Sequence, residues 1–378
     1  MNRFGVYVHI PFCKKKCDYC DFVSFSNSND LQERYIECLL KEIEYRNIGT
    51  KEKVDTVYFG GGTPSFINAT LIEKVLNKIR GKFEVKEDAE ITLEVNPGTA
   101  NKEKLEKYKS IGINRLSIGL QSSSDRLLKL IGRIHTYDEF VEVYRLAREV
   151  GFKNINVDLM LALPTQTMDE LNDSVEKIVD LKPEHVSVYS LILEEGTPLE
   201  KKISSKELEL IDEDVERKMY WGVKEKLKRN GYVHYEISNF ALEGMYSRHN
   251  VDCWNQEEYV GYGLASHSYI DGKRVSNTEN IEEYIENIES SILDKNITVN
   301  EVQDREAMAK EFMMLGLRKI NGVSISEFER KFSINPLFYF RFEIEKLTNE
   351  DLIEVDLDNI KLTNKGLDLA NIVFEEFV

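Results

Sequence analysis

Short apolar runs alternate with longer amphipathic stretches through the first two-thirds of the chain. Apolar runs of about four to eight residues predict strands, and apolar positions that recur every three or four residues predict helices. We expect strands near residues 6–10, 54–60, 90–95, 114–120, 154–160 and 185–191. Between them we expect helices near residues 31–46, 71–79, 102–110, 137–150 and 168–180. Strands separated by helices predict parallel βα units.

Parallel βα units can close into a full or partial barrel, whose active site lies at the carboxyl ends of the strands. The residues with chemical potential follow this rule along the chain. Cys13 follows the first expected strand, a glycine run at 60–62 follows the second, Glu94 ends the third, and Gln121 and Asp158 lie at the ends of the next two. The sequence therefore predicts an α/β fold, a partial (βα)6 barrel, with one shared site.

The pattern changes after residue 220. A helix near 221–229 and one strand near 233–240 lead into a polar, glycine-rich connector around 243–263. Helical patterns at 304–318, 324–331 and 336–347 then precede short β-like runs near 353 and 360 and a helix at 364–377. We expect a barrel in residues 1–240, a connector in 241–300 and a small winged-helix-like α+β domain in 301–378.

The composition indicates a globular protein and disfavours several kinds of partner. Hydrophobic residues make up 42% of the 378 residues and charged residues 31%, as in ordinary globular proteins. The net charge of −17 disfavours nucleic acids and anionic membranes as partners, because both attract basic surfaces. The apolar runs are too short for a transmembrane segment, and the first residues lack the apolar core of a signal peptide. We therefore expect a cytoplasmic protein.

Cys13, Cys17 and Cys20 form a CxxxCxxC motif. Three thiolates can hold three irons of a [4Fe–4S] cluster and leave the fourth iron open to a small molecule. A buried helix face and a zinc site are the alternatives. The three lysines between Cys13 and Cys17 argue against a buried face, and the lack of a second CxxC or His pair in the sequence argues against zinc. The isolated Cys38 is expected in the core.

Other candidate residues for a polar ligand lie at the ends of the expected strands. The glycine run lets the backbone approach a ligand closely, although such a run also serves as a tight turn. Glu94, Gln121, Arg133 and Asp158 offer charges and hydrogen-bonding groups. Each of them alone would more often be a surface or ion-pair residue. Their common placement at one end of the barrel favours a binding site.

The chain resembles radical S-adenosylmethionine (SAM) proteins of the oxygen-independent coproporphyrinogen III oxidase group over nearly its whole length. The resemblance rests on the segments Tyr7-Val-His-Ile-Pro-Phe-Cys13, Gly60-Gly-Gly-Thr-Pro64, Glu94-Val-Asn-Pro-Gly-Thr99, Gly119-Leu-Gln-Ser122 and Asp158-Leu-Met160, with residues 312–318 and 362–367 in the small domain.

The resemblance implies a radical SAM barrel in which SAM chelates the open iron through its amine and carboxylate. The SAM contacts that it implies are Tyr7, Tyr19, Gly61, Gly62, Thr63, Glu94, Gln121, Arg133, Asp158 and Ile192. Reduction of the cluster would cleave SAM to methionine and a 5′-deoxyadenosyl radical, chemistry that belongs to the cofactor.

In two features the sequence differs from the oxidases and resembles the HemW-type haem chaperones, a branch of the same group. The oxidases have CxxxCxxCxC, whereas Phe22 takes the place of the last cysteine here. The oxidases also carry a long extension before the cluster motif, which we expect this protein to lack because six residues precede Tyr7. Residues 96–99 and 132–135 are similar to the chaperone branch as well.

That branch bears an HNxxYW motif associated with haem. The matching residues here are His249, Asn250, Cys253 and Trp254, with cysteine in place of tyrosine. Taken alone, His249 and Trp254 would more often pack and hydrogen-bond within the fold. The resemblance favours haem. Histidine and cysteine thiolate both ligate haem iron, so Cys253 either adds a ligand or disrupts the site.

The resemblance thus implies a chaperone that binds haem and transfers it to an acceptor protein, with the cluster and SAM retained and without coproporphyrinogen oxidase activity. The alternative is a radical SAM enzyme that acts on a tetrapyrrole. The sequence does not identify the acceptor. It also leaves open whether haem is bound covalently and whether the chain is oligomeric, a homodimer included.

Overall fold

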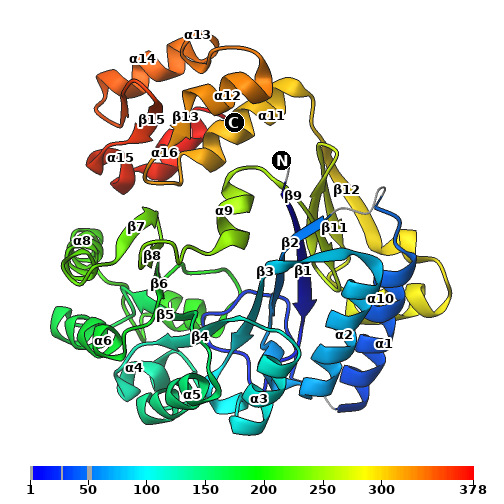
Figure 1. The fold of residues 1–378 in the computed structure, drawn as a ribbon. Coiled ribbons are helices and arrows are strands. Elements are labelled where there is room, and N and C mark those ends of the chain that lie inside the picture. The colour runs from blue at the N-terminus through cyan, green and yellow to red at the C-terminus, as the bar shows by residue number, and fades with distance from the viewer. Residues whose placement is uncertain (1–2, 27–28, 49–52) are drawn as a thin grey trace.

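The computed structural model describes residues 3–26, 29–48 and 53–378. Six adjacent parallel strands in chain order form the middle of a 12-stranded sheet (Figure 1). They are β1 (Phe4–Ile10), β2 (Lys53–Gly61), β3 (Glu84–Val95), β4 (Arg115–Gln121), β5 (Ile155–Leu161) and β6 (His185–Ser190). The expected partial (βα)6 barrel is confirmed, with every strand at or near its predicted position.

Helices between these strands cover the outer face of the curved sheet (Figure 1). They are α1 (Asn29–Tyr45), α2 (Ala69–Lys82), α3 (Lys102–Ser110), α4 (Asp125–Leu130), α5 (Tyr137–Val150) and α6 (Met168–Leu181), with 3-10 turns η1 (Pro64–Phe66) and η2 (Pro97–Thr99). Local sequence explains their ends. Thr136 and Glu139 form a capping box at the start of α5, and Gly151 ends it with a positive φ of 98°. The short helix α4 has no counterpart in the sequence prediction, because six residues give little periodicity.

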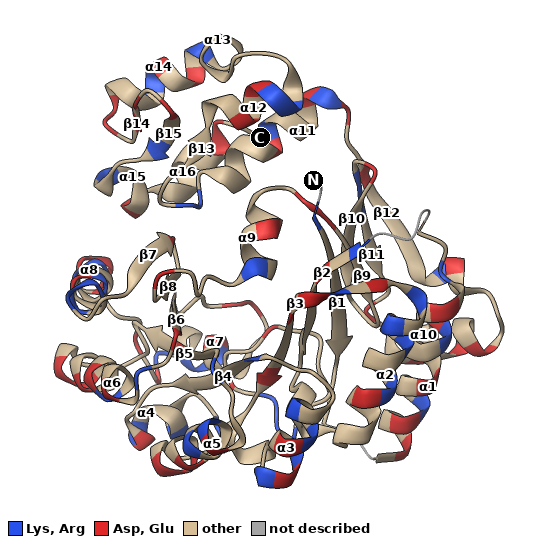
Figure 2. Ribbon diagram, in the orientation of Figure 1, with Lys and Arg blue, Asp and Glu red and all other residues tan. Residues whose placement is uncertain are grey.

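The two faces of each strand have different surroundings. In β1, Val6, Val8 and Ile10 are buried against the helices, so the alternate residues Tyr7 and His9 face the barrel interior. Figure 2 shows that the charged residues gather mainly on the outer helices, where both signs are mixed. Polar side chains on the inner face of the strands are therefore a distinct set, and they line the site described below.

Further strands extend the sheet at both edges. Beyond β1 lie β9 (Glu258–Tyr262), β10 (His267–Ile270), β11 (Lys273–Asn277) and β12 (Ile297–Val302), and beyond β6 lie β8 (Asn239–Ala241) and β7 (Val233–Glu236). The strand expected at 233–240 is thus two short antiparallel strands. The segment 241–300, predicted as a connector, carries β9–β12 because these strands pair at the sheet edge with little apolar patterning. The domain limits at 240 and 300 stay a prediction.

Four helices and one 3-10 turn complete the part of the chain between β6 and residue 300. They are α7 (Pro198–Ser204), α8 (Glu213–Arg229), α9 (Arg248–Trp254), α10 (Ile281–Glu289) and η3 (Leu293–Asn296). Helix α9 carries the HNxxCW residues. It lies between the main sheet and the small domain (Figure 1).

The C-terminal domain has its own core of aromatic residues, with Phe312, Phe328, Phe332 and Phe340 in contact. It contains α11 (Arg305–Gly316), β13 (Val323–Ser324), α12 (Ile325–Phe332), α13 (Pro336–Tyr339), α14 (Arg341–Asn349), β14 (Ile353–Val355), β15 (Asn359–Leu362), α15 (Asn364–Asp368) and α16 (Ala370–Glu375). Its antiparallel sheet has the order β13-β15-β14. Two helices predicted as continuous, 336–347 and 364–377, are each divided, at Phe340 and Leu369.

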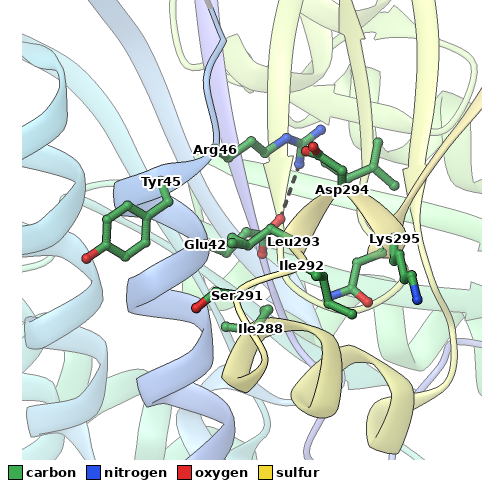
Figure 3. Close-up of a pocket in the computed structure, with 11 residues that line it drawn as sticks. Glu42, Tyr45, Arg46, Ile288, Ser291, Ile292, Leu293, Asp294 and Lys295 are labelled. Carbon is green, nitrogen blue, oxygen red and sulfur yellow. Dashed lines mark hydrogen bonds and ion pairs between the residues drawn. The ribbon is translucent and has the colours of Figure 1, made fainter.

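A buried carboxylate fastens α1 to the added edge of the sheet. Glu42 is 3% exposed and accepts hydrogen bonds from Tyr284 (2.7 Å), Asn277 (2.7 Å) and the amide of Gly263 (2.8 Å). Arg46, one turn later, pairs with Glu42 at 3.3 Å, as the dashed line in Figure 3 marks. Figure 3 shows the side chains of Glu42, in α1, and of Arg46, directly after it, facing the turn that contains Ile292 and Asp294. These contacts hold the edge strands in register with the barrel.

We expect Glu42→Ala to lower the free energy of unfolding by about 3 kcal/mol, because it leaves several buried donors without an acceptor. Urea denaturation followed by circular dichroism measures this change. The matched control is Glu44→Gln on the same helix, since Glu44 forms an exposed ion pair with Lys78 and such pairs contribute little. Equal midpoints for the Glu42 and Glu44 variants would contradict the assigned role of Glu42.

Candidate functional site

A cavity of about 460 Å³ lies inside the barrel, between the loop after β1 and the inner faces of the strands. Most residues singled out from the sequence line it. They are Cys13, Cys17, Tyr19, Cys20, Gly61, Gly62, Thr63, Glu94, Gln121, Arg133, Asp158, Ile192 and Asn250. The lining residues do not include Tyr7, His249, Cys253 or Trp254. The fold therefore brings the candidate residues of β2–β5 and the cysteine loop to one space, while their roles stay predictions.

The cysteine loop is held in place by its backbone. Cys13 N donates to Phe25 O (3.0 Å), and Phe25 N donates to Pro11 O (2.8 Å), so the loop returns to its own start. At the far side, Asp18 N donates to Ile131 O (3.0 Å), and Lys202 pairs with the Asp18 carboxylate (2.9 Å). These bonds hold all three cysteines at the cavity.

The three cysteines are not gathered around a single point, and their role as cluster ligands stays a prediction. Among the described residues, no three His, Cys, Asp or Glu side chains converge closely enough to hold one metal ion. A four-iron cluster instead binds each cysteine at a different iron, which needs a wider spacing. Burial raises the pKa of Cys13 and raises that of Cys20 to about 11. A bound cation such as iron would supply the positive charge that thiolates need here.

The glycine run has a steric reason in this fold. Gly61 has a φ of 110°, and a Cβ there would lie 2.6 Å from the ring of His9. A Cβ on Gly62 would lie 2.9 Å from the amide nitrogen of Phe12. Because the run packs this closely, Gly62 N donates to Ile10 O (2.9 Å), and Thr63 Oγ1 is hydrogen-bonded to Cys13 Sγ (3.3 Å). The run thus fixes the start of the cysteine loop and also lines the cavity.

Two carboxylates face the cavity in a water-poor setting. Burial raises the pKa of Glu94 to about 7, although a hydrogen bond from Tyr58 (2.9 Å) opposes the rise. Burial also raises the pKa of Asp158, against hydrogen bonds donated by Asn156 (2.7 Å) and Ser117 (3.3 Å). The cavity therefore presents one carboxyl group that titrates near neutral pH beside a second that is hydrogen-bonded by neutral groups.

Arg133 connects the cavity to the cysteine loop. Its Nη1 donates to Cys17 Sγ (3.6 Å) and its Nη2 donates to Gly119 O (2.7 Å), while its Nε is buried without a partner among the described residues. Gln121 lies nearby with a positive φ of 69°, where the pairing of β4 and β5 shifts register. Such a bulge redirects a side chain at the end of a strand. An unpaired donor on Arg133 and a redirected amide on Gln121 fit a polar ligand at the cysteine end.

The HNxxCW residues lie at the opposite end of the barrel. His249 Nδ1 is hydrogen-bonded to Thr56 Oγ1 (2.8 Å), and its ring stacks on Tyr58 at 5.2 Å between centroids. Burial lowers the pKa of His249 to about 4, so its imidazole is neutral. Burial raises the pKa of Cys253 to about 12, so it is a thiol. The motif residues do not surround one cavity, because Asn250 alone among them lines the barrel space.

Trp254 faces the small domain instead. The guanidinium carbon of Arg318 lies 4.4 Å from the centre of the Trp254 ring, and the indole Nε1 is buried without a partner among the described residues. The sequence interpretation in which His249 and Trp254 pack within the fold matches these contacts. The motif as an iron-binding site stays a prediction.

Several lining residues escaped the sequence analysis. They are polar or aromatic residues on the inner faces of strands, namely Tyr58, Arg115, Ser117, Asn156, Ser187 and Tyr189. The two-residue period of a strand marks such residues in the sequence. In β4, Leu116 and Ile118 are buried against helices, and the alternate residues Arg115 and Ser117 face inward. Reading the polar positions of each predicted strand as an inner face would have found them.

No helix in residues 3–26, 29–48 and 53–378 is both long and apolar enough to cross a membrane.

Known proteins match both parts of the chain. The model of the radical SAM superfamily matches residues 7–178, and that of the HemN C-terminal domain matches residues 303–369. Among solved structures, the coproporphyrinogen III oxidase HemN of Escherichia coli, a radical SAM enzyme, superposes with a TM-score of 0.86 at 22% identity. That match covers 100% of this chain and 90% of the oxidase, and it shows a shared fold.

Relatives of higher identity cover almost the entire chain. The haem chaperone HemW of Lactococcus lactis is 38% identical over 374 residues, which are 99% of this chain and 97% of that protein. The haem chaperone HemW of Bacillus subtilis is 36% identical over 380 residues, 99% of each chain. The mitochondrial radical S-adenosyl methionine domain-containing protein 1 of Danio rerio is 30% identical over 97% of this chain and 85% of its own length. Because these matches run through both domains, the chain belongs to the HemW family of radical SAM proteins.

Proposed function

We propose that the protein is a haem chaperone, which binds haem and passes it to an acceptor protein. It carries a [4Fe–4S] cluster on Cys13, Cys17 and Cys20, with SAM at the open iron, and it works in the cytoplasm. The observation that carries the proposal is the full-length identity of 38% to a protein named for that activity. Phe22, at the position of the fourth cysteine of the oxidases, supports the same assignment.

The cavity supports the cofactors. A bound cluster would supply an electron and an open iron, and the chain would orient SAM around it. Arg133 has an Nε without a partner in the described part of the chain, and Glu94 has a carboxylate at the cavity. Gly61, Gly62 and Thr63 form the cavity wall beside Cys13. Tyr7 does not line the cavity, but it lies behind Tyr58, with 6.2 Å between the ring centroids. Its contact with SAM stays a prediction.

SAM binding should depend on pH through Glu94. SAM carries a sulfonium cation, which the ionised carboxylate attracts. With a pKa of about 7, Glu94 is about one-tenth ionised at pH 6 and about nine-tenths at pH 8. We expect the affinity for SAM, measured by equilibrium dialysis on cluster-loaded protein, to rise about tenfold over this range. Glu94→Gln should remove the rise, whereas Glu103→Gln on the exposed side of α3 should keep it. A rise that persists in Glu94→Gln would contradict this role.

Arg133 should tune the cluster. Its N–H group donates to Cys17 Sγ, and hydrogen bonds and positive charge near a cluster sulfur stabilise the reduced state. We expect Arg133→Gln to lower the reduction potential by about 60–120 mV, the range for losing one charged hydrogen bond in a one-electron couple. Arg133→Lys should give a smaller fall because the charge remains. Potentiometric titration followed by electron paramagnetic resonance measures this, with the exposed Arg145→Gln as control. An unchanged potential in Arg133→Gln would show that the contact is absent in the loaded protein.

Haem binding tests the proposal itself. We expect saturable haem binding to anaerobic, cluster-loaded protein, followed by absorbance. His249→Ala should weaken it, because the neutral imidazole is the form that ligates iron and its ring also holds α9 against Tyr58. Cys253→Ser should weaken it less, because burial raises the pKa of this thiol to about 12 and so makes a thiolate ligand costly to form. A wild-type protein that holds its cluster but binds no haem would refute the proposal.

The alternative is a radical SAM enzyme acting on a tetrapyrrole. The cysteine loop and the carboxylates at one cavity favour it, because they would suffice to position SAM for cleavage. The same preparation, reduced and mixed with SAM and coproporphyrinogen III, distinguishes the two. Substrate-dependent 5′-deoxyadenosine with loss of carboxylates would support the enzyme. Haem binding without that product supports the chaperone.

A further inference from the structure

The cavity has two chemically different ends. Gln121 and the cysteine loop lie at the carboxyl end of β4, whereas Arg115 is the first residue of that strand. Gln121 lies six positions after Arg115 along the strand, a backbone distance of about 20 Å. A polar group bound by the residues at the cysteine end is therefore too far from Arg115 to accept hydrogen bonds from it.

Arg115 is a buried cation that has no hydrogen-bond or ion-pair partner among the described residues. The residue is 2% exposed, and it faces inward because Leu116 on the other face packs against the helices. Its Nε is buried with no hydrogen-bond acceptor, and no carboxylate of the described residues lies within ion-pair distance of its guanidinium. Buried polar groups in folded proteins are normally paired, and an unpaired buried charge is costly. A guanidinium left open toward a cavity is therefore a site for an anion.

The nearby carboxylates are already engaged. Glu94 accepts a hydrogen bond from Tyr58, and Asp158 accepts hydrogen bonds from Asn156 and Ser117. Arg115 is near enough to lower the pKa of both, but burial outweighs this effect in each case. The positive charge of Arg115 acts on the two carboxyl groups from a distance, and its N–H groups remain available to a ligand.

Helix α9 brings a second open donor to the same end. Asn250 lines the cavity, and its amide makes no hydrogen bond within the described part of the chain. The adjacent His249 fixes the helix through Thr56 (2.8 Å), through its backbone amide to Glu90 (3.1 Å), and by stacking on Tyr58. His249 therefore holds Asn250 at the cavity wall, which explains why the two residues are neighbours in the motif.

We propose that Arg115 and Asn250 form a carboxylate-binding site at the floor of the barrel, and that it holds a propionate of haem. The identification of the carboxylate rests on the proposed function. The planar fork of a guanidinium matches a carboxylate with two parallel hydrogen bonds, and a side-chain amide adds a third donor. Haem carries two such carboxylates. The carboxylate of SAM is expected at the open iron, at the other end of the cavity.

The test compares haem with haem dimethyl ester, which has the same iron and ring but no free carboxylate. Each is titrated into wild type, Arg115→Gln, Asn250→Ala and the exposed Arg145→Gln, all anaerobic and at equal cluster content. We expect wild type and Arg145→Gln to bind haem at least about tenfold more tightly than the diester. Arg115→Gln should bind haem only as tightly as the diester, with its diester affinity unchanged. Asn250→Ala, a neutral change that does not disturb the charge balance, should lose part of the same preference.

The outcomes separate this inference from the proposed function. Equal binding of haem and the diester by wild type would overturn the carboxylate site and leave the chaperone proposal standing. A loss of affinity for both ligands in Arg115→Gln, with an unchanged preference in Asn250→Ala, would show that Arg115 acts only through the fold and would also overturn it. Wild type that binds neither ligand would overturn both.

Discussion

The two-residue period of six parallel strands is the constraint on which the rest of the molecule depends. One set of alternate residues packs against the helices and closes the core, and the other set is left facing inward. The inward set cannot be apolar throughout if the barrel is to hold a polar ligand, and here it includes Tyr58, Arg115 and Asp158. The loops at the strand ends then place the cysteines over this polar interior.

This arrangement concentrates charge where water is scarce. The same cavity is lined by Glu94, Asp158, Arg115 and Arg133. The two arginines each keep a buried Nε that has no partner in residues 3–26, 29–48 and 53–378. Folding gains little from such groups, since desolvating them is unfavourable unless they are paired. The stability comes from elsewhere, from the aliphatic layer under the helices and from clusters with several buried hydrogen bonds, such as that of Glu42. The cavity is thus the part of the barrel that contacts within the chain leave incomplete.

The strands and helices of the barrel were predictable because their apolar periods are strong and their motifs fall at strand ends. The cysteine loop and the carboxylates were found for the same reason. Arg115 and Asn156 were missed, because a single polar residue within a strand is ambiguous until the inner face is known. Edge strands such as β11 were missed because they are short and mostly polar, and their pairing comes from contacts distant in sequence. The positions of His249 and Trp254, which face different parts of the fold, follow from the packing of α9 and not from motif spacing.

The end of α9 is bonded to the small domain at several points. Arg318 lies over Trp254, Lys319 Nζ donates to Asn255 Oδ1 (2.5 Å), and Gln256 Nε2 donates to Glu311 (2.8 Å). The start of the same short helix carries His249, which stacks on Tyr58, and Asn250, which lines the cavity. A seven-residue helix is nearly rigid along its axis, so its two ends move together. A tilt of the small domain would therefore shift Asn250 at the cavity wall, so a protein bound to that domain would change the cavity without contacting it.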